Sequence, residues 1–177
     1  MIKIRKAEKN DLDRIEQIYD RIHDEEEKGV TTTGWIRNIY PTRKTAEEAL
    51  DRNDLFVMTD EDNIVAAAVI NQIQVDEYKY AEWKHHAKDT EVMVLHGLAV
   101  DPFEKGKGYG RAFIAYYENY ARQSGCAALR MDTNARNTRA RSLYQKLGYK
   151  EKGIVKCVFN GIPNVQLVCF EKYAGEA

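Results

Sequence analysis

Residues 95–113, LHGLAVDPFEKGKGYGRAF, decide how this chain folds. An apolar strand runs into a short polar turn, a glycine-rich loop follows, and a helix begins near Arg111. Glycine tolerates positive φ and lets the backbone approach a ligand closely. Successive N–H groups in such a loop, beside the positive end of a helix, form a concavity that binds anions. The pattern therefore predicts a pyrophosphate site.

The spacing of the glycines excludes two common phosphate loops. A dinucleotide-binding fold uses G-x-G-x-x-G, whereas Gly106, Gly108 and Gly110 are spaced G-x-G-x-G. A P-loop places Ser or Thr after its Gly-Lys pair, whereas Gly106-Lys107 is followed by Gly108. What remains is another kind of pyrophosphate loop, or a flexible glycine turn without a ligand.

The composition indicates one globular domain spanning residues 1–177. Hydrophobic residues make up 44% and charged residues 31% of the chain, which is ordinary for a globular protein. A formal net charge of −1 gives no general basic footprint, so we expect no nucleic-acid partner. Neither a signal peptide nor an apolar run of membrane-spanning length is evident in the sequence. We therefore expect a cytoplasmic protein without a membrane partner.

The cysteines and histidines give no pattern typical of a metal site. Cys126, Cys157 and Cys169 fall in apolar runs, without the spacing of metal ligands or of a redox pair. Thiols without obvious partners indicate a reducing compartment. His85 and His86 are adjacent, and neighbouring residues do not face one way on a helix or a strand. We therefore predict no metal.

Strands and helices alternate along the chain, which predicts an α/β fold. Hydrophobic periodicity indicates strands at 2–5, 55–58, 64–74, 92–100, 126–131, 154–159 and 165–170. Helices are expected after a cap at Asn10 or Asp11, at 43–51, after the glycine loop, and at 138–147. The acidic run at residues 24–27 is expected to be a solvated helix end.

A second informative stretch is MDTNARNTRARSLYQKLGY, residues 131–149. Asn134 and Asn137 fall where a strand gives way to a helix, a usual place for polar groups that face a ligand in α/β folds. Asn137 can equally cap this helix. Tyr144 shares a helix face with apolar neighbours, so a simple core position is the alternative to a functional one.

Together, the two stretches resemble the GNAT superfamily of acyl-CoA-dependent N-acyltransferases. Residues 105–110 are similar to its pyrophosphate loop, (Gln or Arg)-x-x-Gly-x-(Gly or Ala), with Lys105 as a departure at the first position. Residues 137–149, N-x-x-A-x-x-L-Y-x-K-L-G-Y, resemble its motif beside the pantetheine arm. The resemblance implies a mixed, mostly antiparallel central sheet flanked by helices, with a parallel strand pair around the acyl-CoA site.

The resemblance also implies roles for individual residues, with acetyl-CoA as the donor and no metal. Tyr144 would be the general acid that protonates the departing thiolate. The strand backbone at Leu98, Ala99 and Val100 would bind the pantetheine arm and the developing oxyanion. The remaining cofactor contacts would come from Asn134 and Asn137 and from the loop residues Lys105, Gly106, Lys107, Gly108, Tyr109, Gly110 and Arg111.

An amine that attacks a thioester must first lose a proton, so the site needs a base. His96 is a candidate because histidine titrates near neutrality, and strand alternation puts it on one face with Leu98 and Val100. LHGLAV also resembles the arylalkylamine N-acetyltransferases, although their second histidine is replaced by Val94. A core histidine or a water route remains an alternative, and weaker candidates are Glu82, Glu91 and Asp101.

The acceptor side is indicated by aromatic residues in irregular segments. Trp35, Tyr40, Tyr80 and Trp83 flank the acceptor cleft of the family and can line an amine pocket, or they can anchor their loops to the core. The resulting hypothesis is transfer of an acetyl group to a primary amine of a small molecule or peptide. The alternatives are a non-catalytic acyl-CoA-binding or sensory module and a nucleotide-binding protein. The sequence leaves a homodimer open.

Overall fold

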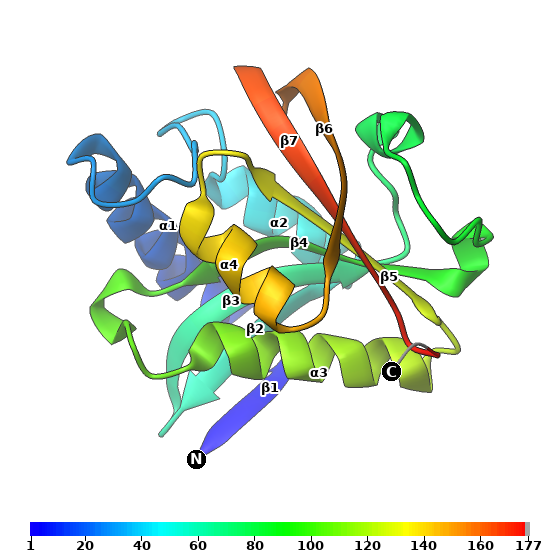
Figure 1. The fold of residues 1–177 in the computed structure, drawn as a ribbon. Helices are drawn as coiled ribbons and strands as arrows, with labels where there is room; N and C mark the ends of the chain where they lie inside the picture. Colours follow the sequence, from blue (N-terminus) through cyan, green and yellow to red (C-terminus); the bar gives the residue numbers. More distant parts are fainter. Residues whose placement is uncertain (176–177) are drawn as a thin grey trace.

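The computed structural model describes residues 1–175. Their strands form one mixed sheet, which is flanked by helices (Figure 1). The strands follow the order β1-β2-β3-β4-β5-β7-β6 across the sheet. They are β1 (Ile2–Lys6), β2 (Leu55–Asp60), β3 (Asn63–Asn71), β4 (Val92–Val100), β5 (Ala128–Asn134), β6 (Lys150–Phe159) and β7 (Ile162–Tyr173). Neighbouring strands are antiparallel except β4 and β5, which are parallel. The predicted mostly antiparallel sheet with a parallel pair is confirmed.

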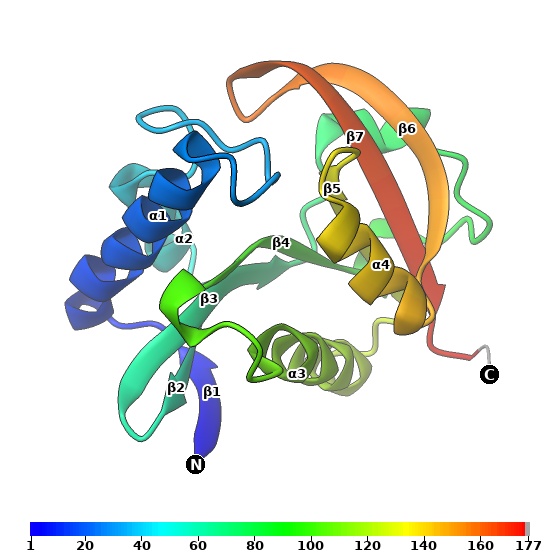
Figure 2. The same cartoon turned by 60° about the vertical axis from the view of Figure 1, so that its left-hand side comes forward.

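Helices cover both faces of the sheet (Figures 1 and 2). On one face, α1 (Leu12–Glu27) and α2 (Arg43–Asp51) share a hydrophobic cluster with side chains of β2 and β3. On the other, α3 (Tyr109–Gln123) and α4 (Thr138–Lys146) pack in a separate cluster. Short 3-10 segments lie at η1 (Lys9–Asp11), η2 (Asp76–Tyr80), η3 (Asp89–Glu91) and η4 (Pro102–Glu104). Within residues 1–175, no helix is long and apolar enough to cross a membrane.

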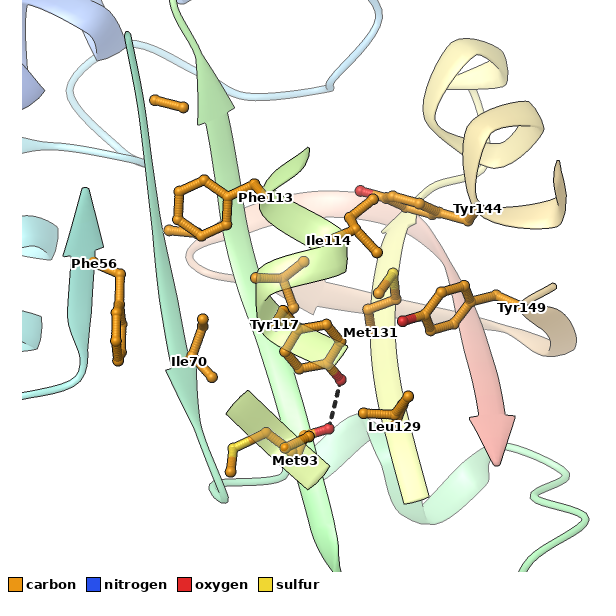
Figure 3. Close-up of a cluster of buried hydrophobic side chains, with 14 of the residues drawn as sticks. Phe56, Ile70, Met93, Phe113, Ile114, Tyr117, Leu129, Met131, Tyr144 and Tyr149 are labelled. Carbon is orange, nitrogen blue, oxygen red and sulfur yellow. Dashed lines mark hydrogen bonds between the residues drawn. The ribbon is translucent and has the colours of Figure 1, made fainter. Parts of the chain in front are cut away.

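The helices form where apolar residues recur at helical spacing. In α1 the side chains of Ile15, Ile18 and Ile22 are buried at intervals of three and four residues. In α3 the buried stripe contains Phe113 and Tyr117, which point into the cluster in Figure 3. Phe113 and Tyr117 are thus part of the core.

Element boundaries match the sequence best where local signals are strong. The bounds of α2 and β4 are those predicted. The last hairpin is longer than predicted, because its turn contains only Asn160 and Gly161. Both have positive φ, 52° and 79°, as a two-residue hairpin turn requires. β5 begins later than expected, at Ala128.

The parallel strands β4 and β5 pair over only part of their length. Paired residues run from Val92 with Ala128 to Leu95 with Met131. Beyond this point β4 continues beside β3, while β5 continues beside β7. The two strands therefore separate, and each keeps one edge that no described strand covers.

A β-bulge in β4 at Gly97 accompanies the separation. The register against β3 shifts between Ala67 and Val69, which face Ala99 and His96 respectively, and Gly97 has φ of 58°. Leu98 and Val100 consequently pack in the α3 cluster, as do Met93 and Leu95 before the bulge. The prediction that His96 shares a face with Leu98 and Val100 is therefore wrong, because an inserted residue reverses the alternation.

One buried hydroxyl joins the parallel strands just before they part. Tyr117 of α3 is fully buried. Its hydroxyl lies 2.7 Å from the carbonyl oxygen of Met93 in β4 and 3.2 Å from that of Arg130 in β5. Figure 3 shows the first of these hydrogen bonds. The side chain thus fixes the position of α3 relative to both strands.

Replacing Tyr117 by Phe should lower the free energy of unfolding by about 1–2 kcal/mol, because the hydroxyl donor shared by two buried carbonyl groups is lost while the ring remains. Urea denaturation of both proteins measures this difference. Tyr116→Phe is the matched control, since the half-buried Tyr116 hydroxyl has no hydrogen bond within residues 1–175. Equal losses in the two variants would contradict the role given to Tyr117.

Candidate active site

A cavity of about 500 Å³ opens where β4 and β5 separate. Its strand walls are His96, Gly97 and Leu98 of β4 and Asp132, Thr133 and Asn134 of β5. Tyr144 and Asn137 line it from α4 and its N-terminal cap, and Trp35 and Tyr40 line it from the loop after α1. A second cavity of about 830 Å³ shares lining residues with the first, namely Gly34, Trp35, Asn134, Ile162 and Val165.

Tyr144 is a buried residue whose hydroxyl has no partner among the described side chains. Its ring packs edge-on against Phe170 and Tyr149, with centroids 5.3 and 6.4 Å away. Figure 3 shows the side chain reaching from α4 toward the space between β4 and β5. Burial, and to a lesser degree the charge of Asp132, raises the pKa of Tyr144 well above its usual value. The hydroxyl therefore stays protonated and available to the cavity.

The glycine loop exposes its backbone at the start of α3. Gly106 and Gly108 have φ of 80° and 78°. A Cβ at either position would meet nothing within 4 Å, so open space lies beside the backbone. Gly108 is the N-cap of α3, where the first N–H groups of the helix have no partner within the helix. This is the arrangement that favours an anion.

The two lysines of the loop and the aspartate before it are already held by ion pairs. Lys105 and Lys107 contact Glu25 and Glu104, each at 2.5 Å. Asp101, just before the loop, is fully buried between Arg14 and Arg21 of α1, which makes it a structural anchor and not a free base.

Tyr109 and Arg111 face different ways in the first turn of α3. The Tyr109 side chain is buried and its hydroxyl donates to Asp60 at 2.7 Å. Its backbone, and not its ring, is therefore the part that a ligand in the loop could reach. Arg111 is exposed, which leaves its guanidinium available on the same turn.

Both asparagines after β5 also have structural partners. The side-chain oxygen of Asn137 accepts a hydrogen bond from the backbone N–H of Ala140 at 3.2 Å and caps α4. Asn134 accepts from the backbone N–H of Arg136 at 3.0 Å, and its amide lies against the backbone of Gly34. Since both side chains still line the cavity, capping and a ligand contact are compatible.

Trp35 and Tyr40 form one wall of the cavity. Their rings meet edge-on with centroids 5.8 Å apart. The loop that carries them is held by Glu26, which accepts hydrogen bonds from the backbone N–H groups of Thr33 and Gly34 at 2.9 and 3.0 Å. The prediction of a solvated acidic run at residues 24–27 is therefore wrong for Glu26.

Tyr80 and Trp83, in contrast, do not line either cavity. Tyr80 is 68% exposed. The indole N–H of Trp83 donates to the carbonyl oxygen of Tyr78 at 2.8 Å, and the guanidinium of Arg130 lies 4.1 Å from its ring centre. The expectation that these two residues bind substrate is corrected: Trp83 anchors its segment to the core, and Tyr80 faces outward.

His96 lies in the cavity wall, but its surroundings weaken it as a base. Its Nε2 donates to the side-chain oxygen of Asn71 at 2.8 Å, and Asn71 in turn donates to Asp54 at 2.9 Å. Burial lowers the pKa of His96 to about 4, although the charge of Asp54 opposes this shift. The imidazole is therefore neutral at physiological pH and only weakly basic.

Asp132 is a cavity residue that the sequence pattern did not single out. Its Oδ2 accepts a hydrogen bond from the Tyr78 hydroxyl at 2.6 Å. Burial raises the pKa of Asp132 to about 6, although the bond from Tyr78 opposes the shift. The only signal in the sequence is a carboxylate at the end of a strand, two residues before Asn134. Within residues 1–175, no group of His, Cys, Asp and Glu is arranged to hold a metal ion.

Comparison with known proteins agrees with this architecture. The model of the acetyltransferase (GNAT) family matches residues 13–149. An uncharacterized N-acetyltransferase of Methanocaldococcus jannaschii is 32% identical over 74 residues, which are 42% of this chain and 33% of that protein. The chain thus aligns with about a third of that relative's length.

Solved structures resemble the whole described fold. A GNAT-family acetyltransferase of Streptococcus agalactiae has a TM-score of 0.80 at 19% identity, covering 99% of this chain and 96% of that one. YncA of Salmonella typhimurium, solved with its cofactor acetyl-CoA, has a TM-score of 0.68 at 17% identity, covering 99% and 95%. At such identities these matches establish the fold.

His96 should make stability depend on pH in mild acid. Its pKa of about 4 in the folded protein lies below the value of about 6.5 for a free histidine. Between these values the unfolded chain binds the proton more strongly, so the free energy of unfolding falls as the pH drops. Urea titrations should give a steeper fall for the wild type than for His96→Gln. Parallel profiles would contradict this.

Proposed function

Because the chain belongs to the acetyltransferase (GNAT) family, we propose that residues 1–177 form one N-acetyltransferase domain. It moves an acetyl group from acetyl-CoA to the primary amine of a small molecule or peptide. The observation that carries this proposal is the unpartnered hydroxyl of Tyr144 at the cavity between β4 and β5. The three free cysteines support a reducing compartment, and we assign the protein to the cytoplasm.

Acetyl-CoA as the donor is supported by the glycine loop and by YncA, whose structure was solved with acetyl-CoA. Gly106 and Gly108 leave the backbone open to a pyrophosphate, and the helix end supplies positive potential. The glycine loop leads into the first turn of α3, which packs against α4, the helix that carries Tyr144. A Cβ on Gly110 would lie 3.6 Å from a methyl group of Leu143, the residue before Tyr144. Phosphates at the loop are therefore compatible with a thioester near Tyr144.

The uncovered edge of β4 suits the pantetheine arm. After Leu95 the strand pairs only with β3, so backbone groups of Leu98, Ala99 and Val100 on the other edge remain for amide groups of a ligand. A backbone N–H on this edge can also stabilise the negative charge that develops on the thioester oxygen. The donor would then enter between the strands with its acetyl group in the cavity.

Tyr144 is the proposed general acid. The acceptor nitrogen attacks the acetyl carbon, the C–S bond breaks, and the departing sulfur needs a proton. A tyrosine with a strongly raised pKa stays protonated until that moment. The opposite wall, with Trp35 and Tyr40, accommodates the acceptor, and their apolar faces suit the carbon skeleton of an amine.

Tyr144→Phe should lower the turnover number at least about a hundredfold while acetyl-CoA affinity changes little, since only the proton donor is lost. CoA thiol release with a panel of small and peptide amines measures turnover, and calorimetry measures affinity. Tyr149→Phe is the control, because that hydroxyl binds Glu118 at 2.9 Å. Binding of acetyl-CoA without transfer to any amine would instead indicate a non-catalytic module.

Gly108→Ala should weaken acetyl-CoA binding about tenfold, because a left-handed backbone costs an alanine about 1–2 kcal/mol and the loop would change shape to relieve it. Gly125→Ala is a matched control. Gly125 has φ of 75° and equally open surroundings, but lies beyond the other end of α3. Equal acetyl-CoA affinities for the two variants would rule out the loop as the pyrophosphate site.

A further inference from the structure

The cavity between β4 and β5 is reached from both faces of the sheet. Tyr144 belongs to the cluster that contains Met131 and α3 (Figure 3). Successive residues of a strand point to opposite faces, so Asp132, which follows Met131, points to the other face. There it lines the cavity together with Tyr40 and Trp35. A thioester held between the strands would thus have a hydroxyl on one side and a carboxylate on the other.

The carboxylate of Asp132 is held in place by a buried tyrosine. The Tyr78 hydroxyl donates to Oδ2 at 2.6 Å. Tyr78 is itself only 2% exposed, and Trp83 packs on its ring with centroids 5.2 Å apart. This contact uses one carboxylate oxygen. The other has no hydrogen bond from any side chain in the described part of the chain, and Asp132 lines the cavity.

The groups around Asp132 are mostly neutral. The titratable groups that interact electrostatically with Asp132 come from five segments of the chain. They are Tyr40 from the loop after α1, Glu77 and Tyr78 from η2, Tyr144 from α4, Cys157 from β6 and Cys169 from β7. Burial and the Glu77 carboxylate disfavour the ionised form of Asp132, and only the Tyr78 bond favours it. An ammonium group entering the cavity would therefore supply the positive charge that the surroundings of this carboxylate lack.

The other acidic and basic groups of the cavity fit this role less well. Burial raises the pKa of Asp132 to about 6, whereas it lowers the pKa of His96 to about 4. Asp132 is thus the stronger base by about two units. Glu48 also lines the cavity, but its side chain is 58% exposed and lies 3.7 Å from Lys44.

We propose that Asp132 binds the acceptor ammonium and takes its proton, with Tyr78 as the residue that positions the carboxylate. This inference rests on the acetyl transfer proposed above and adds its proton acceptor. An alkylammonium has a pKa of about 10. With an aspartate of pKa about 6, the transfer is about a hundredfold less unfavourable than with an ordinary aspartate.

The proton and electron balance closes with these two residues. Asp132 accepts one proton from the ammonium nitrogen, which frees its lone pair. The N–C bond to the acetyl carbon forms, the C–S bond breaks, and Tyr144 gives its proton to the sulfur. The second proton that the nitrogen loses returns to the Tyr144 oxygen, and Asp132 releases its proton to water. The products are the amide, the CoA thiol and one proton.

The test is the pH profile of kcat/KM with acetyl-CoA and two probe amines, 2-phenylethylamine and glycine amide. In the wild type the rate should fall below about pH 6, with the same midpoint for both amines, because Asp132 must be ionised. Asp132→Asn should lower kcat at least about a hundredfold and remove this fall. Tyr78→Phe should move the midpoint to higher pH, because the hydrogen bond that favours the ionised form is lost.

Asp62→Asn is the matched control, since Asp62 is an exposed residue of the β2–β3 turn, and it should leave the profile unchanged. Acetyl-CoA affinity reports that each variant is folded. An unchanged fall in Asp132→Asn, or an unmoved midpoint in Tyr78→Phe, would overturn the assignment of Asp132 while leaving acetyl transfer intact. Absence of thiol release with both amines in the wild type would count against the proposed function itself.

A second readout needs no acceptor. The ¹³C shift of the Asp132 carboxyl should titrate with a midpoint near 6 in the wild type and higher in Tyr78→Phe. A wild-type midpoint near the ordinary aspartate value of about 4 would overturn the role of Asp132 whether or not an amine is acetylated.

Discussion

The separation of two parallel strands is the constraint on which the rest of the structure depends. β4 and β5 pair only as far as Leu95 and Met131, and beyond these residues each strand is paired on its other side alone, with β3 and β7 respectively. Buried backbone groups normally find hydrogen-bond partners. Where no strand supplies them, the uncovered edges of β4 and β5 face a cavity that is also lined by polar side chains. The backbone pairing of the strands thus determines where the cavity lies, and the side chains determine how it is lined.

Gly97 couples this separation to the acceptor wall. The bulge needs a residue that tolerates φ of 58°, and the same residue must be small, because a Cβ there would lie 2.8 Å from the Tyr40 hydroxyl oxygen. Gly97 therefore changes which face of the sheet the last residues of β4 point to, and it leaves room for the Tyr40 side chain from the loop after α1. Tyr117 acts on the other side of the separation, where its hydroxyl keeps the strands joined.

The sequence predicted those features that depend on neighbouring residues. The alternation of apolar residues located β4, and the glycines located the turn into α3, because each signal lies within a few positions. The bulge at Gly97 was missed, since one inserted residue shows only against a partner strand. Glu26 and Asp132 were missed for a related reason: their roles come from contacts with Thr33 and Tyr78, and Tyr78 lies 54 positions from Asp132. A charge pattern along the chain contains no record of such contacts.

The aromatic residues at positions 78–83 do not line the cavity, but they support a residue that does. Trp83 was expected to contact substrate, yet its indole N–H binds the backbone of Tyr78, and the Tyr78 hydroxyl binds Asp132. Trp83 is therefore connected to the cavity residue Asp132 through Tyr78, by two successive hydrogen bonds. Arg130 packs over the same indole ring, while its backbone carbonyl lies within hydrogen-bond distance of Tyr117. Arg130 thus contacts both the tryptophan that packs on Tyr78 and the hydroxyl that joins β4 to β5, so the orientation of Asp132 is coupled to the packing that holds the two strands together.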